Sequence, residues 1–250
     1  MHAYLTLVRR ELASYFVSLT GYVLLAAVLL LLGVSFTVLL PALRLEASDV
    51  PLTQVFYETM FFWLILLVTT PVLTMRLFAL EKFTGTFETL MTTPVSDLQV
   101  VLAKFTGAWL FYVVMWLPLP ACLFALRNYT NDPAAFDVSA MGATFAGILL
   151  LGGLFVALGC FASALTKNQI IAAMASFALG LTAFMLSFLS ALSTNVRGWQ
   201  AQVFAHVSLV EHMRAFVRGV VDSRHVVFYL SLTGFFLYLT LKVVESRRWK

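Results

Sequence analysis

The chain has 250 residues, of which 61% are hydrophobic and 11% are charged, and its mean hydropathy is +0.94. A soluble domain carries roughly 25% charged residues, so the composition excludes a water-soluble globular protein and indicates a membrane protein. The net charge of +4 is explained by where basic residues lie relative to a membrane, and we expect no nucleic acid as a partner.

The first predicted element is an amphipathic helix over residues 2–16. Four apolar residues share one of its faces: Leu5, Val8, Leu12 and Phe16. The helix is too short and too polar to span a membrane, so we expect it to lie at the cytosolic interface with Arg9 and Arg10 near lipid headgroups. A simple surface anchor explains the pattern equally well.

Six apolar stretches are long enough to cross a membrane, since a spanning helix needs about 20 apolar residues. They cover residues 20–43, 56–75, 100–126, 138–165, 169–193 and 226–244. Helices are expected because lipid offers no partner to free backbone groups, and the stretches lack the alternation of a β-barrel. Pro71, Pro118 and Pro120 are expected to kink their helices.

The distribution of basic residues predicts the orientation. With the N-terminus in the cytosol, ten Lys and Arg residues fall in inside segments and six in outside segments. We therefore expect both termini to be cytoplasmic. As the location we expect a bacterial plasma (inner) membrane, in which the protein is integral. The first apolar run begins near Leu19 and is too long for a signal peptide, so none is expected. Cys122 and Cys160 lie inside spans and are interpreted as small apolar residues, not as a disulfide.

The fourth span is rich in small residues, which let helix backbones approach closely. They are Gly142, Ala143, Gly147, Gly152, Gly153, Ala157 and Gly159. Packing within the chain is the favoured interpretation, and a dimer contact is the alternative.

Residues 76–104 form a polar island between the second and third spans. Gly85 is placed to begin a short helix, Glu88 would lie near the positive end of its dipole, and Pro94 would end it. Ser96 starts a capping box that begins the third span. We expect a short amphipathic helix tied to two spans, able to transmit a push from a soluble partner. A helix that only rests on the headgroups fits equally well.

The outer segment 195–224 predicts a second amphipathic helix, on the opposite side of the membrane. Ser208 and Glu211 form a capping-box pattern that can start it. Five apolar residues then fall on one side: Leu209, Met213, Phe216, Val217 and Val220. Glu211, Arg214 and Arg218 face the other side.

No catalytic residue or metal site is predicted. The span interiors carry no charge near their middles, which argues against a proton-driven carrier and an intramembrane protease. The four histidines, His2, His206, His212 and His225, match no familiar metal spacing. No nucleotide-binding loop is present and the spans use the whole chain, so any energy for transport is expected from another polypeptide.

Three groups of residues resemble permeases of the ABC type-2 exporter family. The central group is Glu81, Gly85, Thr86, Glu88, Leu90, Pro94, Val95, Ser96 and Lys104. The N-terminal group is Arg9, Arg10, Glu11 and Leu12, with Tyr15 and Phe16. The outer group, similar to the gliding-motility-associated branch and its copper-maturation relatives, is Ser208, His212, Phe216, Gly219, Val220 and Asp222.

The resemblance implies an all-α polytopic protein forming one permease domain over residues 1–250, with six spans. It implies a homo- or heterodimer in membrane lipid, each half docked on a separate ABC ATPase subunit that holds the ATP and Mg²⁺. The residues implied in ATPase coupling are Glu81, Gly85, Thr86, Glu88, Pro94 and Ser96. Arg9, Arg10 and Glu11 would lie in the entry helix. The alternative function is a non-transporting scaffold or regulator that recruits a cytosolic partner.

Overall fold

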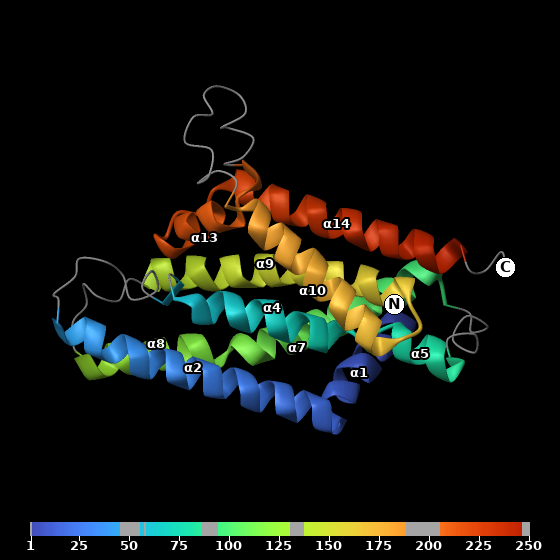
Figure 1. Ribbon diagram of the computed structural model, residues 1–250, viewed down its shortest axis with the longest axis horizontal. Coiled ribbons are helices and arrows are strands. Elements are labelled where there is room, and N and C mark those ends of the chain that lie inside the picture. Colours follow the sequence, from blue (N-terminus) through green and yellow to red (C-terminus); the bar gives the residue numbers. More distant parts are fainter. Residues whose placement is uncertain are drawn as a thin grey trace.

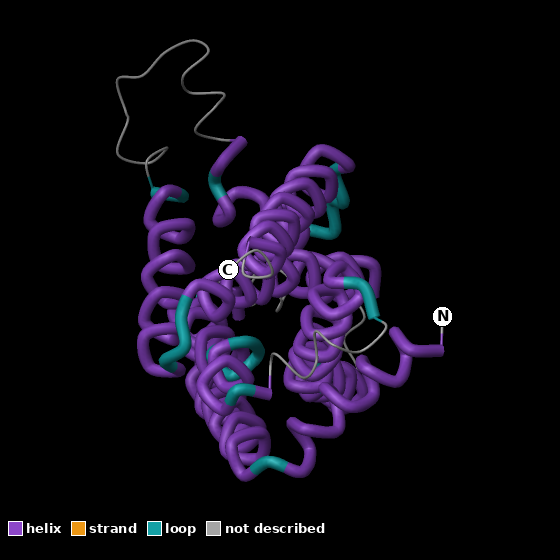
Figure 2. The backbone as a smooth tube through the Cα atoms, turned by 90° about the vertical axis from the view of Figure 1, so that its right-hand side faces the viewer, coloured by secondary structure: helices purple, strands orange, loops and turns teal. Residues whose placement is uncertain are grey.

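The computed structural model describes residues 2–45, 56–57, 59–86, 95–130, 138–188 and 206–246. Within these ranges the secondary structure is helical, with short loops and no strand (Figure 2). The predicted all-α polytopic fold is confirmed.

Six long apolar helices run through the described part of the chain, each beginning close to its predicted position (Figure 1). The helices that form these spans are α2 (Leu19–Leu45), α4 (Met60–Thr74), α7 (Asp97–Trp116), α9 (Val138–Leu165), α10 (Gln169–Leu186) and α14 (Ser223–Ser246). The described residues also form the helices α1 (His2–Val17), α5 (Ala79–Thr84), α8 (Pro118–Thr130) and α13 (Leu209–Val217).

Prolines shape the second and third spans. Pro118 is the first residue of α8, directly after Leu117 closes α7, so the third span is built from two consecutive helices. This position suits proline because the first helical residue needs no amide donor. Pro71 lies inside α4, which ends three residues later at Thr74.

The central helix is α9, which contacts α4, α7, α10, α13 and α14. Its glycines make these contacts close. A Cβ on Gly152 would come within 2.0 Å of the Tyr112 ring, and one on Gly159 within 2.0 Å of the Thr74 hydroxyl. The small residues of this span therefore serve packing within the chain, as the sequence favoured.

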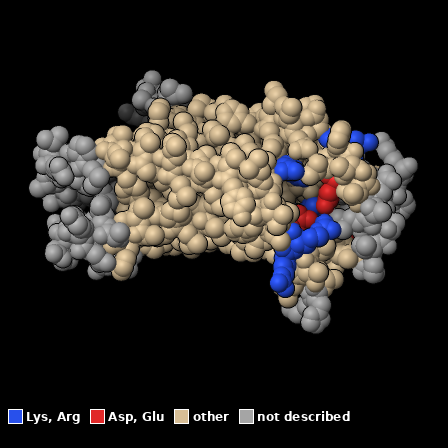
Figure 3. Space-filling view, turned by 90° about the horizontal axis from the view of Figure 1, so that it is seen from below, with Lys and Arg blue, Asp and Glu red and all other residues tan. Residues whose placement is uncertain are grey.

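The two ends of the bundle differ. Figure 1 places both chain termini, α1 and α5 at one end, which we call the α5 end, and α13 at the opposite end, the α13 end. On the face seen in Figure 3, the blue and red side chains gather near the α5 end, and the long middle is uncharged. An uncharged belt of this kind is what hydrocarbon requires of a spanning protein.

The predicted apolar face of α1 is only partly right. Val8 is buried and Leu12 packs against the core, but Leu5 is 62% exposed and Phe16 is 37% exposed. Tyr15, which the sequence analysis left off this face, is buried instead. The face is rotated because α1 packs on α7 and α2. Its neighbours, and not lipid alone, determine which side it buries.

Candidate functional site

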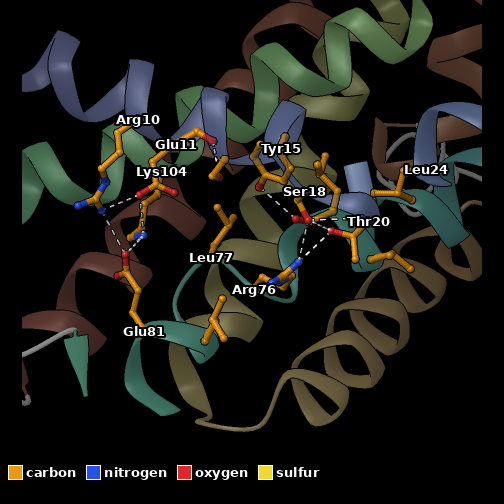
Figure 4. Close-up of a pocket in the computed structure, with 14 residues that line it drawn as sticks. Arg10, Glu11, Tyr15, Ser18, Thr20, Leu24, Arg76, Leu77, Glu81 and Lys104 are labelled. Atoms are coloured by element: carbon orange, nitrogen blue, oxygen red, sulfur yellow. Dashed lines mark hydrogen bonds and ion pairs between the residues drawn. The ribbon is translucent and has the colours of Figure 1, made fainter. Parts of the chain in front are cut away.

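Four charged residues from three helices meet at the α5 end and form what we call the ion network. Lys104 Nζ of α7 lies 2.7 Å from Glu81 Oε1 of α5 and 3.1 Å from Glu11 Oε1 of α1 (Figure 4). Arg10 of α1 reaches the same two oxygens, at 3.0 Å from Glu11 and 3.3 Å from Glu81. Two cations and two carboxylates thus join α1, α5 and α7.

Burial makes the ion network energetically important. The side chain of Lys104 is 3% exposed, that of Glu11 12% and that of Glu81 17%, whereas that of Arg10 is 54% exposed. Removing one member of a buried ion pair costs about 3–5 kcal/mol, because the remaining charge stays buried without a counter-charge. Lys104 is the buried cation of the network, and its loss would leave Glu11 and Glu81 paired only with the exposed Arg10.

Helix α1 docks on α7 through close backbone approach as well as charge. A Cβ on Gly107 would come 2.8 Å from Glu11 Cβ, so only glycine allows the present distance between the helices. The Tyr4 and Thr106 hydroxyl oxygens are 2.8 Å apart. Tyr15 stacks on Phe111, with ring centroids 4.8 Å apart. The entry helix is therefore an integral part of the bundle.

Tyr15 also ties α1 to the second span. Its hydroxyl donates to the Leu73 carbonyl at 3.1 Å. Burial raises the pKa of Tyr15 well above its usual value, and nearby Cys160 and Glu11 add to the effect. The hydroxyl therefore stays protonated and remains a donor at physiological pH.

Helix α5, a short helix that the sequence analysis did not anticipate, is fixed to the end of α9. Ser163 Oγ of α9 accepts from the amides of Phe78 and Ala79, each at 3.1 Å, and donates to the Met75 carbonyl at 3.2 Å. These amides begin α5 and would otherwise lack acceptors. Lys82 donates to the Ala164 carbonyl, in the last turn of α9, where a cation is favoured.

Gly85 has a role that the sequence analysis missed. It is the C-cap of α5, with φ of 74°, a left-handed conformation that favours glycine. The sequence analysis placed it at the start of the next helix instead. Thr86 lies beside this cap, its hydroxyl oxygen 2.9 Å from that of Thr84. Glu88 and Pro94 lie outside the described residues, and their coupling roles stay predictions.

The capping box before the third span is confirmed. The Gln99 amide donates to Ser96 Oγ, and the Ser96 amide donates to Gln99 Oε1, both at 3.3 Å. The third span therefore begins at Asp97, seven residues before Lys104. Of the predicted coupling and entry residues, the structure brings Glu81, Arg10 and Glu11 together, whereas Arg9 is exposed.

Lys104 is the member of the network whose role the sequence analysis missed. The sequence analysis named it only as part of the family pattern. A usable signal exists, because a lysine one or two turns inside an apolar helix requires a nearby carboxylate. The sequence does not say which carboxylate that is.

At the α13 end, the predicted outer helix is present and fixed to α10. Ser208 caps α13 by accepting from the Glu211 amide at 3.3 Å, and it donates to the Ser187 carbonyl at 3.1 Å. Phe216 packs directly against Gly147 of α9, because a Cβ added at Gly147 would lie 2.8 Å from the Phe216 ring. Val220 does not continue the apolar side of this helix as predicted, because α13 ends at Val217, and it is 57% exposed.

His212 of α13 is buried in an aromatic cluster. Its ring stacks on His225 with centroids 4.1 Å apart, and Phe228 and Tyr229 pack edge-on. Burial, assisted by His225 and His206, lowers the pKa of His212 from 6.5 to about 4, so the ring is neutral at pH 7. Within the described ranges no group of three or more His, Cys, Asp or Glu residues could hold a metal ion.

Comparison with known proteins identifies the family of the chain. The family model described as ABC-2 family transporter protein matches residues 49–209, well over half of the chain, and includes α4, α5, α7 and α9. No curated protein matches the chain. Membership implies an ABC ATPase subunit as a partner. With its six spans and this match, the chain belongs to the ABC-2 transporter family and is a membrane-spanning permease component of an ABC transporter.

Proposed function

We propose that this permease receives the work of ATP hydrolysis at its α5 end, from a separate ABC ATPase subunit, and passes it into the spans through α5. The observation that carries the proposal is the ion network of Arg10, Glu11, Glu81 and Lys104. It joins α5, a short helix within the predicted coupling segment, to the entry helix and the third span. ATP and Mg²⁺ belong to the partner chain.

The contacts of α5 support a role in transmitting displacement from the ATPase subunit to the spans. A displacement of α5 would act on α7 and α1 through Glu81, and on α9 through Ser163 and Lys82. Because α9 contacts α4, α7, α10, α13 and α14, such a displacement would also act on these helices. Packed interiors respond to displacement by shifting as units and not by local yielding.

Orientation and assembly are part of the same proposal. Both termini share the α5 end, and the excess of basic residues predicts that this end faces the cytoplasm of a bacterial inner membrane. We infer a dimer of permeases that forms the translocation path. Exposed apolar side chains on α10, including Ile170 and Met174, offer surface for a second permease or for lipid. The outer segment favours the gliding-motility or copper-maturation branch.

Affinity capture in mild detergent from native membranes tests the proposal. The tagged permease should co-purify with an ABC ATPase subunit, and Glu81→Gln should lower the ATPase activity of the captured complex at least several-fold. Glu245→Gln is the matched control, because Glu245 makes an exposed ion pair with Lys242 on α14. Capture of a cytosolic partner without ATPase activity would favour a scaffold and contradict the exporter.

A further inference from the structure

A polar cavity of about 270 Å³ lies where α1 turns into α2, walled also by α4, α5 and α7 (Figure 4). Its polar lining includes Arg76, Ser18 and Thr20, and its apolar lining includes Leu24, Leu73 and Leu77. We call it the elbow cavity. Its volume is near the lower end for ligand pockets, about 300 Å³, so a small polar group fits but a whole lipid does not.

Arg76 enters this cavity without a counter-charge. Its Nη1 donates to Ser18 Oγ at 3.1 Å and to Thr20 Oγ1 at 2.9 Å. These hydroxyls hold the guanidinium in place but do not neutralise it. In the described part of the chain no carboxylate lies within ion-pair distance of Arg76, although the residue is half-buried. Such a group favours an anionic ligand.

The charges around the cavity do not balance. Arg10, Arg76 and Lys104 line it against Glu11 and Glu81, which leaves one net positive charge. Both carboxylates are engaged by Lys104 and Arg10, so the remaining charge is that of Arg76. A single phosphate negative charge would neutralise it, and the planar guanidinium suits paired phosphate oxygens.

We infer the depth of the cavity in a membrane from its place at the start of the first span, where lipid headgroups are expected. The cavity adjoins the start of the first span. The outer surface of the turn between α1 and α2 is apolar, with Val17 86% exposed and Leu19 79% exposed. Tyr22 is 57% exposed one turn further on, and tyrosine is typical of the membrane interface. The backbone turns sharply between α1 and α2, because a Cβ on Gly21 would come 2.0 Å from the Tyr15 carbonyl oxygen.

We propose that the elbow cavity is a phosphate-binding site in which Arg76 is the binding cation. The ligand is a phosphate group carrying one negative charge, the chemistry that a phosphatidylglycerol headgroup and free phosphate share. Its depth places it within reach of a lipid whose chains remain outside the elbow. Because Glu81 and Lys104 also line the cavity, the bound phosphate stands beside the ion network. The site goes beyond the coupling proposal and does not depend on it.

Binding to the purified full chain in dodecyl maltoside micelles, whose sugar headgroup contains no phosphate, tests the site. One arm adds phosphatidylglycerol to the micelles, and the other adds inorganic phosphate to the buffer. Wild-type protein should bind phosphatidylglycerol about tenfold more tightly than Arg76→Gln, since a hydrogen-bonded charge is lost. Arg76→Lys, which keeps the charge, should retain more affinity than Arg76→Gln.

Arg9→Gln is the matched control, because Arg9 is an exposed arginine of α1 that does not line the cavity. It should bind like wild type, and thermal unfolding of each variant checks that it is folded. If phosphatidylglycerol binds in an Arg76-dependent way, the ligand is a lipid headgroup. If inorganic phosphate does so, the ligand is a soluble phosphate. Each of these results supports the site. Binding in neither arm, or equal loss in Arg9→Gln and Arg76→Gln, overturns it.

Discussion

Lys104 Nζ lies 2.7 Å from Glu81 Oε1, and this contact joins the third span to α5 across 23 residues of sequence. The lysine side chain is 3% exposed and also lies over the Phe78 ring, 5.5 Å from its centroid. This buried cation connects the short helix α5 directly to the third span. The contact is therefore suited to carry force between a soluble partner and the bundle.

Replacing Lys104 with methionine should destabilise the permease by about 3–5 kcal/mol, because Glu11 and Glu81 lose their buried cation. Reversible unfolding in mixed micelles measures the change. Lys242→Met is the control, since its exposed pair with Glu245 is screened by solvent and should contribute little to stability. Equal losses in the two variants would show that the ion network does not stabilise the fold.

Replacing Gly107 with alanine should displace α1 from α7. The new Cβ would meet Glu11 Cβ at 2.8 Å, and overpacking of this kind costs about 1–3 kcal/mol. Thermal unfolding in detergent checks this. Gly142→Ala on α9, where a Cβ meets nothing within 4 Å, should be neutral or stabilising. A Gly107→Ala protein as stable as wild type would rule out the close approach.

Replacing Ser163 with alanine should loosen α5. The amides of Phe78 and Ala79 lose their acceptor, and a buried unsatisfied group costs about 1–3 kcal/mol. Hydrogen exchange of these two amides should accelerate, whereas Ser246→Ala, at an exposed position of α14, should leave them unchanged. Unchanged exchange in Ser163→Ala would mean that α5 is not held from α9.

Acid should destabilise the α13 end through His212. Its pKa falls from 6.5 to about 4 on folding, so the folded state binds fewer protons than the unfolded state between these values. The stability is fully present above pH 6.5 and is lost as the pH falls toward 4. Unfolding measured across this range should show a weaker pH dependence in His212→Phe. His206→Phe, at an exposed position, should keep most of the dependence.

The six spans could be predicted because their signal is local. Hydropathy and length fix a spanning helix without knowledge of its neighbours, and Ser96 and Ser208 mark helix starts through contacts within three residues. The orientation of α1 could not be predicted in this way. Whether Leu5 or Tyr15 is buried depends on α7, which lies about ninety residues further along the chain.

The candidate site was predictable only in part for the same reason. Glu81 and Glu11 were placed in neighbouring elements, but their common partner Lys104 depends on how three helices meet. Gly85 was expected to begin a helix because glycine permits both helix starts and ends. In the structure, Ser163 accepts hydrogen bonds from the amides of Phe78 and Ala79, and a helix begins at Ala79. Gly85 therefore ends this helix and does not begin the next one.

Crosslinking in native membranes tests most directly whether α5 contacts the ATPase subunit. Cysteine is introduced at Phe83, which is 75% exposed on α5, or at Val220, which is 57% exposed at the α13 end, after Cys122 is replaced by serine. We predict that Phe83→Cys crosslinks to an ABC ATPase subunit and that Val220→Cys does not. A crosslink from Val220→Cys and none from Phe83→Cys would contradict the account.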